Sequence, residues 1–245
     1  MASSLKYLLI FDFDETIVNE NSDDCVIQAA PNQELPDWLG NTIQDGFYYQ
    51  YMQKVLKYLG DQGVKLADIR SVYERIPLSP GMPDLFRFLM KKQDRFEIIL
   101  ISDANVFGIE SFLKAHGFHS LFLKVISNHT KVEKNGYLSL EPYHAHTCPK
   151  CPASMCKRKI VTEYLAERSK DGVAFEKVMY VGDGANDFCP SVVLTSTDVA
   201  FSRKNYPMHQ LIQKEQQKGT FQAKVVPWDS ADIVRDYLQE LLNKS

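Results

Sequence analysis

The stretch that decides the fold is Leu8-Leu9-Ile10-Phe11-Asp12-Phe13-Asp14, an apolar run that ends in two acids. A continuous apolar run of this kind is typical of a parallel strand that is buried on both faces of a sheet. Two later segments have the same form, because 98–101 is followed by Ser102-Asp103 and 178–181 by Gly182-Asp183. Ligands bind beyond the carboxyl ends of parallel strands, so we expect these distant polar residues to form one site.

Helical periodicity separates these strands and predicts an α/β fold with a doubly wound, Rossmann-like parallel sheet. The expected helices are 84–92, 106–116, 157–169, 207–217 and 231–242. Residues 17–78 interrupt the alternation, because they carry helical patterns at 46–59 and 66–76 without a strand. We therefore predict an α/β core formed by residues 1–16 plus 79–245, with a helical cap inserted as residues 17–78.

Composition limits the classes of function. The chain has 245 residues, of which 44% are hydrophobic, and a net charge of −3. Such a charge argues against binding to a nucleic-acid backbone. No stretch approaches the roughly 18 apolar residues of a membrane span, and the run 7–11 is too short for a signal peptide. We therefore predict a cytoplasmic protein without a membrane span or a nucleic-acid partner; its oligomeric state cannot be read from the sequence.

Asp12 and Asp14 stand two residues apart at the end of a strand, so both side chains would leave the same face of an extended chain. One carboxylate could attack a phosphorus atom, while the other gives a proton to the leaving alkoxide and later takes one from water. An Asp-x-Asp pair can also cap a helix or face solvent. The polar residues at the other strand ends favour the catalytic interpretation.

The segment Gly182-Asp183-Gly184-Ala185-Asn186-Asp187 places two acids in a turn whose glycines allow a close approach to a ligand. Carboxylate oxygens suit Mg²⁺, which usually takes one or two of them together with substrate phosphate. The alternative is a tight turn that needs glycine for its backbone alone. Ser102 could donate a hydrogen bond to a phosphoryl oxygen.

A cation should lie near the acids. A phosphate ester beside Asp12 and Asp183 carries about four negative charges, of which Mg²⁺ neutralises two. Lys157, at the start of an expected helix, is the candidate. Lys159 is the rival, and a solvated lysine is the alternative to both.

Four motifs resemble those of the haloacid-dehalogenase superfamily over nearly the whole chain: 11–16, Ser102, Lys157 and 182–187. The resemblance implies that Asp12 is the nucleophile and Asp14 the acid/base, with Ser102 and Lys157 as further catalytic residues. It also implies a Mg²⁺ site formed by Asp12, the backbone carbonyl of Asp14 and Asp183, with Asp187 behind these ligands. A cap inserted after the first motif, the C1 type, resembles that of the phosphoserine-phosphatase-like branch.

Three further segments are similar to the PHOSPHO family of phosphoethanolamine/phosphocholine phosphatases: 20–24, 101–105 and Cys-Pro-Ala-Ser-Met-Cys-Lys at 151–157. This resemblance implies hydrolysis of phosphoethanolamine and phosphocholine through an aspartyl-phosphate, with release of inorganic phosphate. It implies that Asp23 and Asp103 contact the amino-alcohol end of the substrate. By resemblance alone, biomineralization and a location inside vesicles are implied as well.

Aromatic rings would also suit a quaternary ammonium, and the expected cap offers several, at 47–51, Trp38 and Tyr58. Most of these rings are expected to pack in the core of the cap. Two other functions stay open: a pyridoxal-phosphate or phosphoserine phosphatase, and a catalytically silent scaffold of the same fold. Glu15, where the related pyridoxal-phosphate phosphatases tend to carry Asn, favours the amino-alcohol branch.

A group of five soft ligands lies just before Lys157: His144, His146, Cys148, Cys151 and Cys156. Their spacing suits a structural Zn²⁺ ion, which would fix the loop that presents Lys157. Reduced cysteines in an ordinary loop also account for this composition, because the segment has no second Cys-x2-Cys pair.

Overall fold

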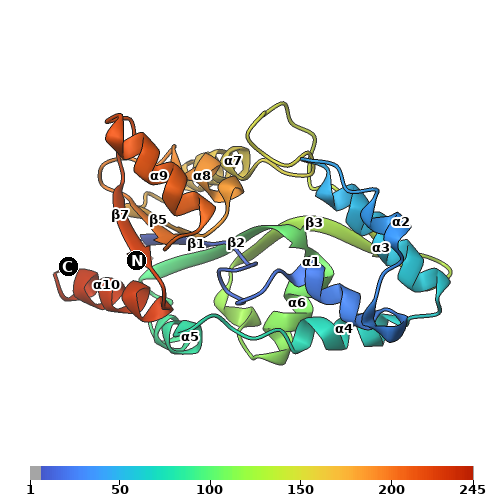
Figure 1. The fold of residues 1–245 in the computed structure, drawn as a ribbon. Coiled ribbons are helices and arrows are strands. Elements are labelled where there is room, and N and C mark those ends of the chain that lie inside the picture. Colours follow the sequence, from blue (N-terminus) through green and yellow to red (C-terminus); the bar gives the residue numbers. More distant parts are fainter. Residues whose placement is uncertain (1–6, 245) are drawn as a thin grey trace.

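The computed structural model describes residues 7–244 and contains one seven-stranded sheet (Figure 1). The first six residues of the predicted core and residue 245 lie outside the described residues. The strands are β1 (Tyr7–Phe11), β2 (Phe96–Asn105), β3 (Lys124–Val132), β4 (Leu138–Glu141), β5 (Lys177–Gly182), β6 (Val199–Arg203) and β7 (Lys224–Trp228). Their order is β4-β3-β2-β1-β5-β6-β7, and every neighbouring pair is parallel except β3 and β4. The α/β fold is confirmed, and β1, β2 and β5 contain the three predicted strands.

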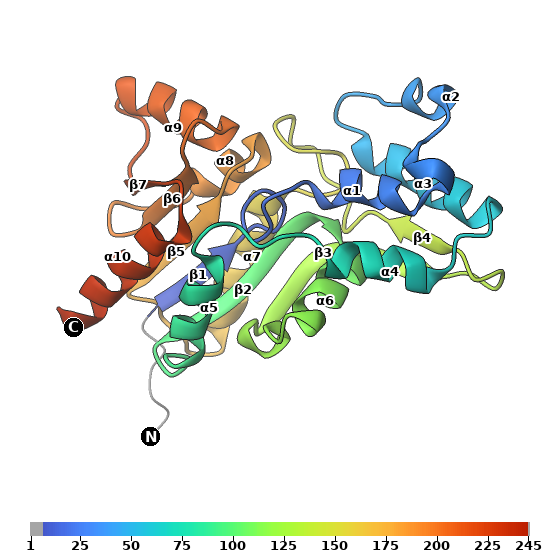
Figure 2. The same ribbon diagram turned by 60° about the horizontal axis from the view of Figure 1, so that its bottom comes forward.

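Helices cover both faces of the sheet (Figures 1 and 2). One face carries α5 (Met82–Met90), α6 (Val106–Ala115) and α10 (Ala231–Asn243), and the other carries α7 (Lys157–Lys170), α8 (Ala185–Ser191) and α9 (Pro207–Gln217). This arrangement confirms the doubly wound sheet. The five core helices expected from the sequence are present, whereas the short helix α8 was not predicted.

The side chains of β1 alternate between two hydrophobic cores. Leu9 and Phe11 belong to the core under α5, α6 and α10, where Phe11 meets the ring of Phe86 edge-on with 5.6 Å between centroids. Leu8 and Ile10 belong to the core under α7, α8 and α9. Because burial of one large apolar side chain contributes about 1.5–3 kcal/mol, an uninterrupted apolar run is favoured wherever both faces of a strand are covered.

The segment 17–78 projects beyond the carboxyl edge of the sheet and is built from helices (Figure 2). They are α1 (Ser22–Cys25), α2 (Asp37–Gly40), α3 (Tyr48–Asp61) and α4 (Leu66–Glu74), with 3₁₀ turns at Val26–Ala29 and Pro31–Gln33. The chain enters and leaves the segment side by side: Val18 and Leu78 form an antiparallel bridge, and Ser79 N–H donates to the Ile17 carbonyl (2.9 Å). The division into core and cap remains a prediction that this geometry supports.

The segment 17–78 contacts the rest of the structure at two further places. The hydroxyl of Tyr73 in α4 accepts a hydrogen bond from Asn105 at the end of β2 (2.8 Å), and the same ring packs against Gly108 of α6. The side chain of Gln53 in α3 donates to the carbonyl of Leu140 in β4. Within residues 7–244, no helix combines the length and the apolar character that crossing a membrane requires.

Candidate active site

The three predicted strands end at one place. Phe11 of β1 pairs with Leu100 of β2 and with Val181 of β5, and the next N–H along the chain, that of Asp12, donates to the Val181 carbonyl (3.0 Å). The polar residues that follow these positions therefore share one edge of the sheet. This is the convergence that the sequence predicts.

Lys157 is the buried cation that contacts Asp12 at this edge. Its Nζ lies 2.7 Å from Oδ2 of Asp12 and 2.8 Å from Oδ1 of Asp187, and its side chain is 1% exposed. Burial lowers the pKa of Lys157, but attraction to the two carboxylates outweighs burial, so the pKa lies above its usual value and the side chain stays charged. Lys159, the rival candidate, is on the surface and 4.0 Å from Glu163.

Asp187 holds Lys157 in place. Its Oδ1 accepts hydrogen bonds from Lys157 (2.8 Å) and the Tyr180 hydroxyl (2.7 Å), and its Oδ2 accepts from the backbone N–H groups of Asp183 (3.0 Å) and Gly184 (2.9 Å). Burial would raise the pKa of Asp187, but Lys157 and these hydrogen bonds outweigh it and lower the pKa. Both oxygens are occupied, which suits a positioning role behind the reacting groups.

Gly182 makes this arrangement possible. A Cβ atom at this position would lie 2.6 Å from the carboxylate carbon of Asp187, and real Cβ atoms do not approach other atoms so closely. The Asp187 carboxylate cannot move aside without breaking its hydrogen bonds. The backbone of β5 therefore has to end in glycine for Asp187 to fold back beneath it.

The acids leave a charge that one lysine does not balance. Carboxylate oxygens of Asp12, Asp183 and Asp187 lie within 4.8 Å of one another, and a further hydrogen bond links the Thr16 hydroxyl to Asp183 (2.9 Å). Burial, followed by repulsion from Asp187, raises the pKa of Asp183 to about 8, and the same two causes raise the pKa of Asp12. When all three carboxylates are ionised they exceed the charge of Lys157 by two, so these hard oxygen donors fit a divalent cation, which Asp12 and Asp183 could hold.

Asp14 is connected to the segment 17–78 through α1. Its Oδ1 accepts a hydrogen bond from the backbone N–H of Ser22, the first residue of α1 (2.8 Å), and α1 itself is capped by the side chain of Asn21. Burial, the largest effect, raises the pKa of Asp14 to about 7, although the bond to Ser22 opposes the shift. A carboxyl group with this pKa can both give and accept a proton near neutral pH.

A cavity of about 170 Å³ opens beside Asp14. Its charged lining residues are all acids, namely Asp14, Asp23 and Asp103, and the rest of its lining consists of Asn21, Gly46, Tyr48, Tyr49, Ala104, Pro152 and Ser154. Asp23 is 8% exposed, and its Oδ1 has no hydrogen-bond partner among residues 7–244. Asp103 is oriented by Asn186, whose side-chain N–H donates to its Oδ1 (2.9 Å). The two acids expected to bind substrate thus face one cavity.

The other predicted site residues are Ser102 and the aromatic rings of the segment 17–78. Ser102 is buried in β2, and its hydroxyl oxygen accepts a hydrogen bond from the Ala104 N–H (3.2 Å), so the hydroxyl itself can donate. Of the cap rings, Tyr48 and Tyr49 line the cavity. Trp38 and Tyr58 pack edge-on against each other with 6.3 Å between centroids and are not part of its lining.

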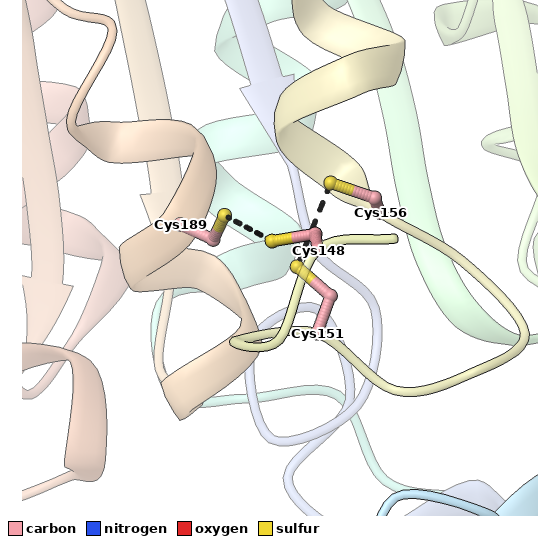
Figure 3. Close-up of side chains that lie close together, drawn as sticks. All are labelled: Cys148, Cys151, Cys156 and Cys189. Carbon is pink, nitrogen blue, oxygen red and sulfur yellow. Dashed lines mark hydrogen bonds between the residues drawn. The ribbon is translucent and has the colours of Figure 1, made fainter. Parts of the chain in front are cut away.

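The cysteine cluster differs from the set of soft ligands that the sequence suggests. The three predicted cysteines lie with a fourth, Cys189 of α8 (Figure 3). The two histidines hydrogen-bond the backbone instead: Nε2 of His144 accepts from the N–H of Cys156 (3.2 Å), and Nδ1 of His146 accepts from the N–H of Cys148 (3.1 Å). The structure thus assembles four sulfur atoms, without a histidine among them.

Sequence reasoning missed four residues that shape the site: Thr16, Tyr180, Gly182 as a close-packing position, and Asn186. Thr16 and Asn186 lie inside the quoted motifs, so their partners could have been sought there. Tyr180 sits in an apolar strand, where nothing in the sequence distinguishes a hydroxyl that bonds Asp187 from an ordinary core ring.

Comparison with known proteins places these observations in a family. A family model described as Putative Phosphatase matches residues 7–242. A phosphoethanolamine/phosphocholine phosphatase from Gallus gallus is 64% identical over 248 residues, covering 100% of this chain and 92% of that protein. One of the same name from Homo sapiens is 56% identical, with 97% of this chain and 90% of that protein covered. A pyridoxal phosphate phosphatase from Homo sapiens is 38% identical over 97% of this chain and 99% of its own length.

Solved structures share the fold at low sequence identity. An apo phosphoserine phosphatase has a TM-score of 0.59 and 18% identity, covering 96% of this chain and 98% of its own. A structure described as a phospho-aspartyl intermediate analogue of phosphoserine phosphatase has a TM-score of 0.57 and 16% identity, with 98% of each chain covered.

Proposed function

Because this chain belongs to the phosphatase family whose model matches residues 7–242, within the haloacid-dehalogenase superfamily, we propose that it hydrolyses the phosphate esters of small cationic amino alcohols. Phosphoethanolamine and phosphocholine are the proposed substrates. The names of the Gallus gallus and Homo sapiens relatives support this choice.

The arrangement of Asp12 and Asp14 supports a two-step reaction. A carboxylate oxygen of Asp12 forms a bond to phosphorus as the bond from phosphorus to the alcohol oxygen breaks, and Asp14 gives its proton to the departing alkoxide. Asp14 then takes a proton from water, whose oxygen attacks the aspartyl-phosphate, releases inorganic phosphate and restores Asp12. A pKa of about 7 for Asp14 supports both proton transfers.

Lys157 and Ser102 would act on the phosphoryl group. Lys157 is already 2.7 Å from Asp12, so its charge lies where negative charge must be balanced as the nucleophile attacks. The Ser102 hydroxyl can donate to a phosphoryl oxygen. Mg²⁺ is the proposed cofactor: Asp12, Asp183 and the backbone carbonyl of Asp14 would hold it, and when bound it would neutralise charge on the phosphoryl oxygens.

The single observation that carries the substrate class is the acidic cavity beside Asp14. A cation two carbons away from the phosphate would meet Asp23 and Asp103 there, with the rings of Tyr48 and Tyr49 close by. Because Oδ1 of Asp23 is buried without a hydrogen-bond partner among residues 7–244, a substrate donor or cation could satisfy it. Phosphoserine has an ammonium at the same distance but adds a carboxylate, which the acids of this cavity would repel, and pyridoxal phosphate presents an aromatic ring instead. The cytoplasmic location and the role in mineral formation stay predictions.

The test is release of phosphate, in the presence of Mg²⁺, from phosphoethanolamine, phosphocholine, pyridoxal phosphate, phosphoserine and a neutral aryl phosphate. We expect kcat/KM for the two amino-alcohol esters to exceed the others by at least about tenfold, or roughly 1.4 kcal/mol of discrimination. A lead for pyridoxal phosphate or phosphoserine would overturn the substrate class and keep the chemistry. No turnover of any ester would favour the silent scaffold.

A further inference from the structure

Four cysteines from two distant segments meet in a compact group beside the acids. Three come from the loop before α7, and Cys189 comes from α8 (Figure 3). Their sulfur atoms all lie within 4.8 Å of one another, with 3.7 Å between Cys148 and Cys189 and 3.7 Å between Cys151 and Cys156. All four thiols are free, and neither pair approaches the S–S distance of about 2.05 Å found in a disulfide.

These distances are those of a tetrahedral metal site. Zinc binds thiolate sulfur at about 2.3 Å, and a regular tetrahedron of that radius has sulfur atoms about 3.8 Å apart along each edge. The two measured pairs, at 3.7 Å each, are two opposite edges of such a tetrahedron. We propose that one structural zinc ion binds at the centre of this group, with all four cysteines as thiolate ligands: Cys148, Cys151, Cys156 and Cys189.

The surroundings can stabilise the charge of such a site. Binding of Zn²⁺ by four thiols releases four protons and leaves a centre with a net charge of −2. Arg158 and Lys159 line the same cavity, of about 660 Å³, as Cys148 and Cys156. That cavity also gives the ion a route to the sulfur atoms, while Cys156 and Cys189 themselves are buried.

The two histidines fit this site as supports for the loop. Each accepts a hydrogen bond from the backbone N–H of a ligand, His144 from Cys156 and His146 from Cys148. Nε2 of His146 also contacts the Pro152 carbonyl (2.7 Å), so one neutral tautomer satisfies both of its ring nitrogens. Neither ring nitrogen of His146 is then left for the metal, Nε2 of His144 is occupied as well, and the group of possible ligands consists of the four cysteines.

The place of the zinc site in the chain means that it would position Lys157 and Asp187. Cys156 is followed directly by Lys157, and Cys189 follows Asp187 by two residues on α8. A zinc ion that ties Cys156 to Cys189 therefore also fixes the backbones that carry the 2.8 Å pair between Lys157 and Asp187. Four protein ligands leave no open coordination position, so the zinc takes no part in the reaction itself.

The experiment measures metal in the full chain that is purified under reducing conditions, incubated with zinc and then passed through gel filtration in zinc-free buffer. We expect about one zinc per chain by mass spectrometry of the metals, and a zinc absorption-edge spectrum that fits four sulfurs at about 2.3 Å with no nitrogen. Replacement by Co²⁺ should produce the intense sulfur-to-cobalt charge-transfer bands of a thiolate site in the wild-type protein.

Variants distinguish the proposed ligands from other side chains. Cys189→Ser should lose most of the bound zinc, whereas Cys25→Ser, a buried cysteine whose thiol contacts Glu20 outside the group, should retain it. His146→Ala should retain zinc with an unchanged all-sulfur spectrum. A loss of solubility in Cys189→Ser would leave the wild-type spectra as the deciding measurement.

Three results would overturn the proposal. The first is wild-type protein that holds no zinc and whose thiols all react as free thiols. The second is a disulfide within the group after purification under reducing conditions. The third is a zinc content that Cys189→Ser does not change. Nitrogen in the fitted coordination shell would replace the four-sulfur set by one that includes a histidine.

Discussion

The aspartate cluster and the cysteine cluster meet at the same two helices, α7 and α8, and differ in what they leave unsatisfied. Lys157 opens α7 immediately after Cys156, and Asp187 and Cys189 lie two residues apart on α8. Residues two apart point to nearly opposite sides of a helix, so α8 forms a wall between the clusters. The acids retain an unbalanced negative charge next to a cavity, whereas the four sulfur atoms lie within 4.8 Å of one another, as four ligands of one ion would.

This difference separates chemistry from support. The aspartates gather hard oxygens and one lysine, and their excess negative charge could bind a metal cation, which would offset the charge of a phosphoryl group. The cysteines offer four soft ligands and no free position, which is typical of a structural metal site. The following predictions test this contrast, in order of decreasing effect.

The largest effect is expected from Asp12→Asn. The amide cannot act as the nucleophile, so kcat should fall by at least about 10⁴-fold, while thermal unfolding changes little. Turnover of phosphoethanolamine and the melting temperature are the measurements. Asp94→Asn is the matched control, because Asp94 is exposed and precedes the amino end of β2, away from the site at the carboxyl end. A rate near that of wild type would remove Asp12 from the nucleophile's role.

Lys157→Ala is expected to come next. One missing positive charge about 4 Å from the reacting group, at an effective dielectric constant of about 20, corresponds to roughly 4 kcal/mol, or nearly 10³-fold in kcat. Lys159→Ala removes the same side chain from the exposed face of α7 and should keep most of the activity. Equal losses in both variants would mean that Lys157 acts only through the net charge of the helix.

Asp23→Asn should change recognition of the substrate more than turnover. Removal of its charge should raise KM for phosphocholine by about tenfold and leave KM for a neutral aryl phosphate nearly unchanged. Asp37→Asn, an exposed aspartate on α2 that does not line the cavity, is the control. If both substrates respond equally, Asp23 supports the fold of the cap and does not bind the head group.

The smallest effect on the rate is expected from loss of zinc, whereas loss of Mg²⁺ should stop turnover, and the two results together should distinguish the two metal sites. A chelator of Mg²⁺ should stop turnover reversibly. The melting temperature should stay almost unchanged, because Mg²⁺ exchanges with solvent more rapidly than zinc, and zinc in a closed thiolate site is retained. A thiol reagent that releases zinc should lower the melting temperature by about 5–10 °C, the equivalent of losing roughly 2–3 kcal/mol of binding free energy. The opposite pattern would assign the structural role to the aspartates.

The sequence predicted the centre of the fold and the reacting acids because both leave local signals. Strands β1, β2 and β5 are buried on both faces and appear as unbroken apolar runs with acids at their ends. The strands β3 and β7 were missed because their burial is only partial, and β7 contains Pro227, which is tolerated in an edge strand. Helix α8 was missed because it is short and contains Pro190.

The fourth cysteine could not be predicted from spacing. Cys189 meets Cys148 across 41 positions of the chain, and only the packing of α8 against the loop brings the two sulfurs together. The two histidines lie close to the cysteines in sequence, which suggested them as metal ligands. In the structure they accept hydrogen bonds from the backbone of the same loop instead. Local motifs identify ligands that share a segment, and a ligand from another helix depends on the tertiary fold.

Gly182 gives this molecule a hidden limit on variation. A single added methyl group would collide with the Asp187 carboxylate at 2.6 Å, although residue 182 itself carries no reacting group. In a library of all single substitutions selected for activity, position 182 should therefore behave like an active-site position. Even alanine at position 182 should be depleted as strongly as substitutions of Lys157, which Asp187 holds in place. An evolving enzyme of this family could alter the lining of its cavity far more freely than this one backbone atom.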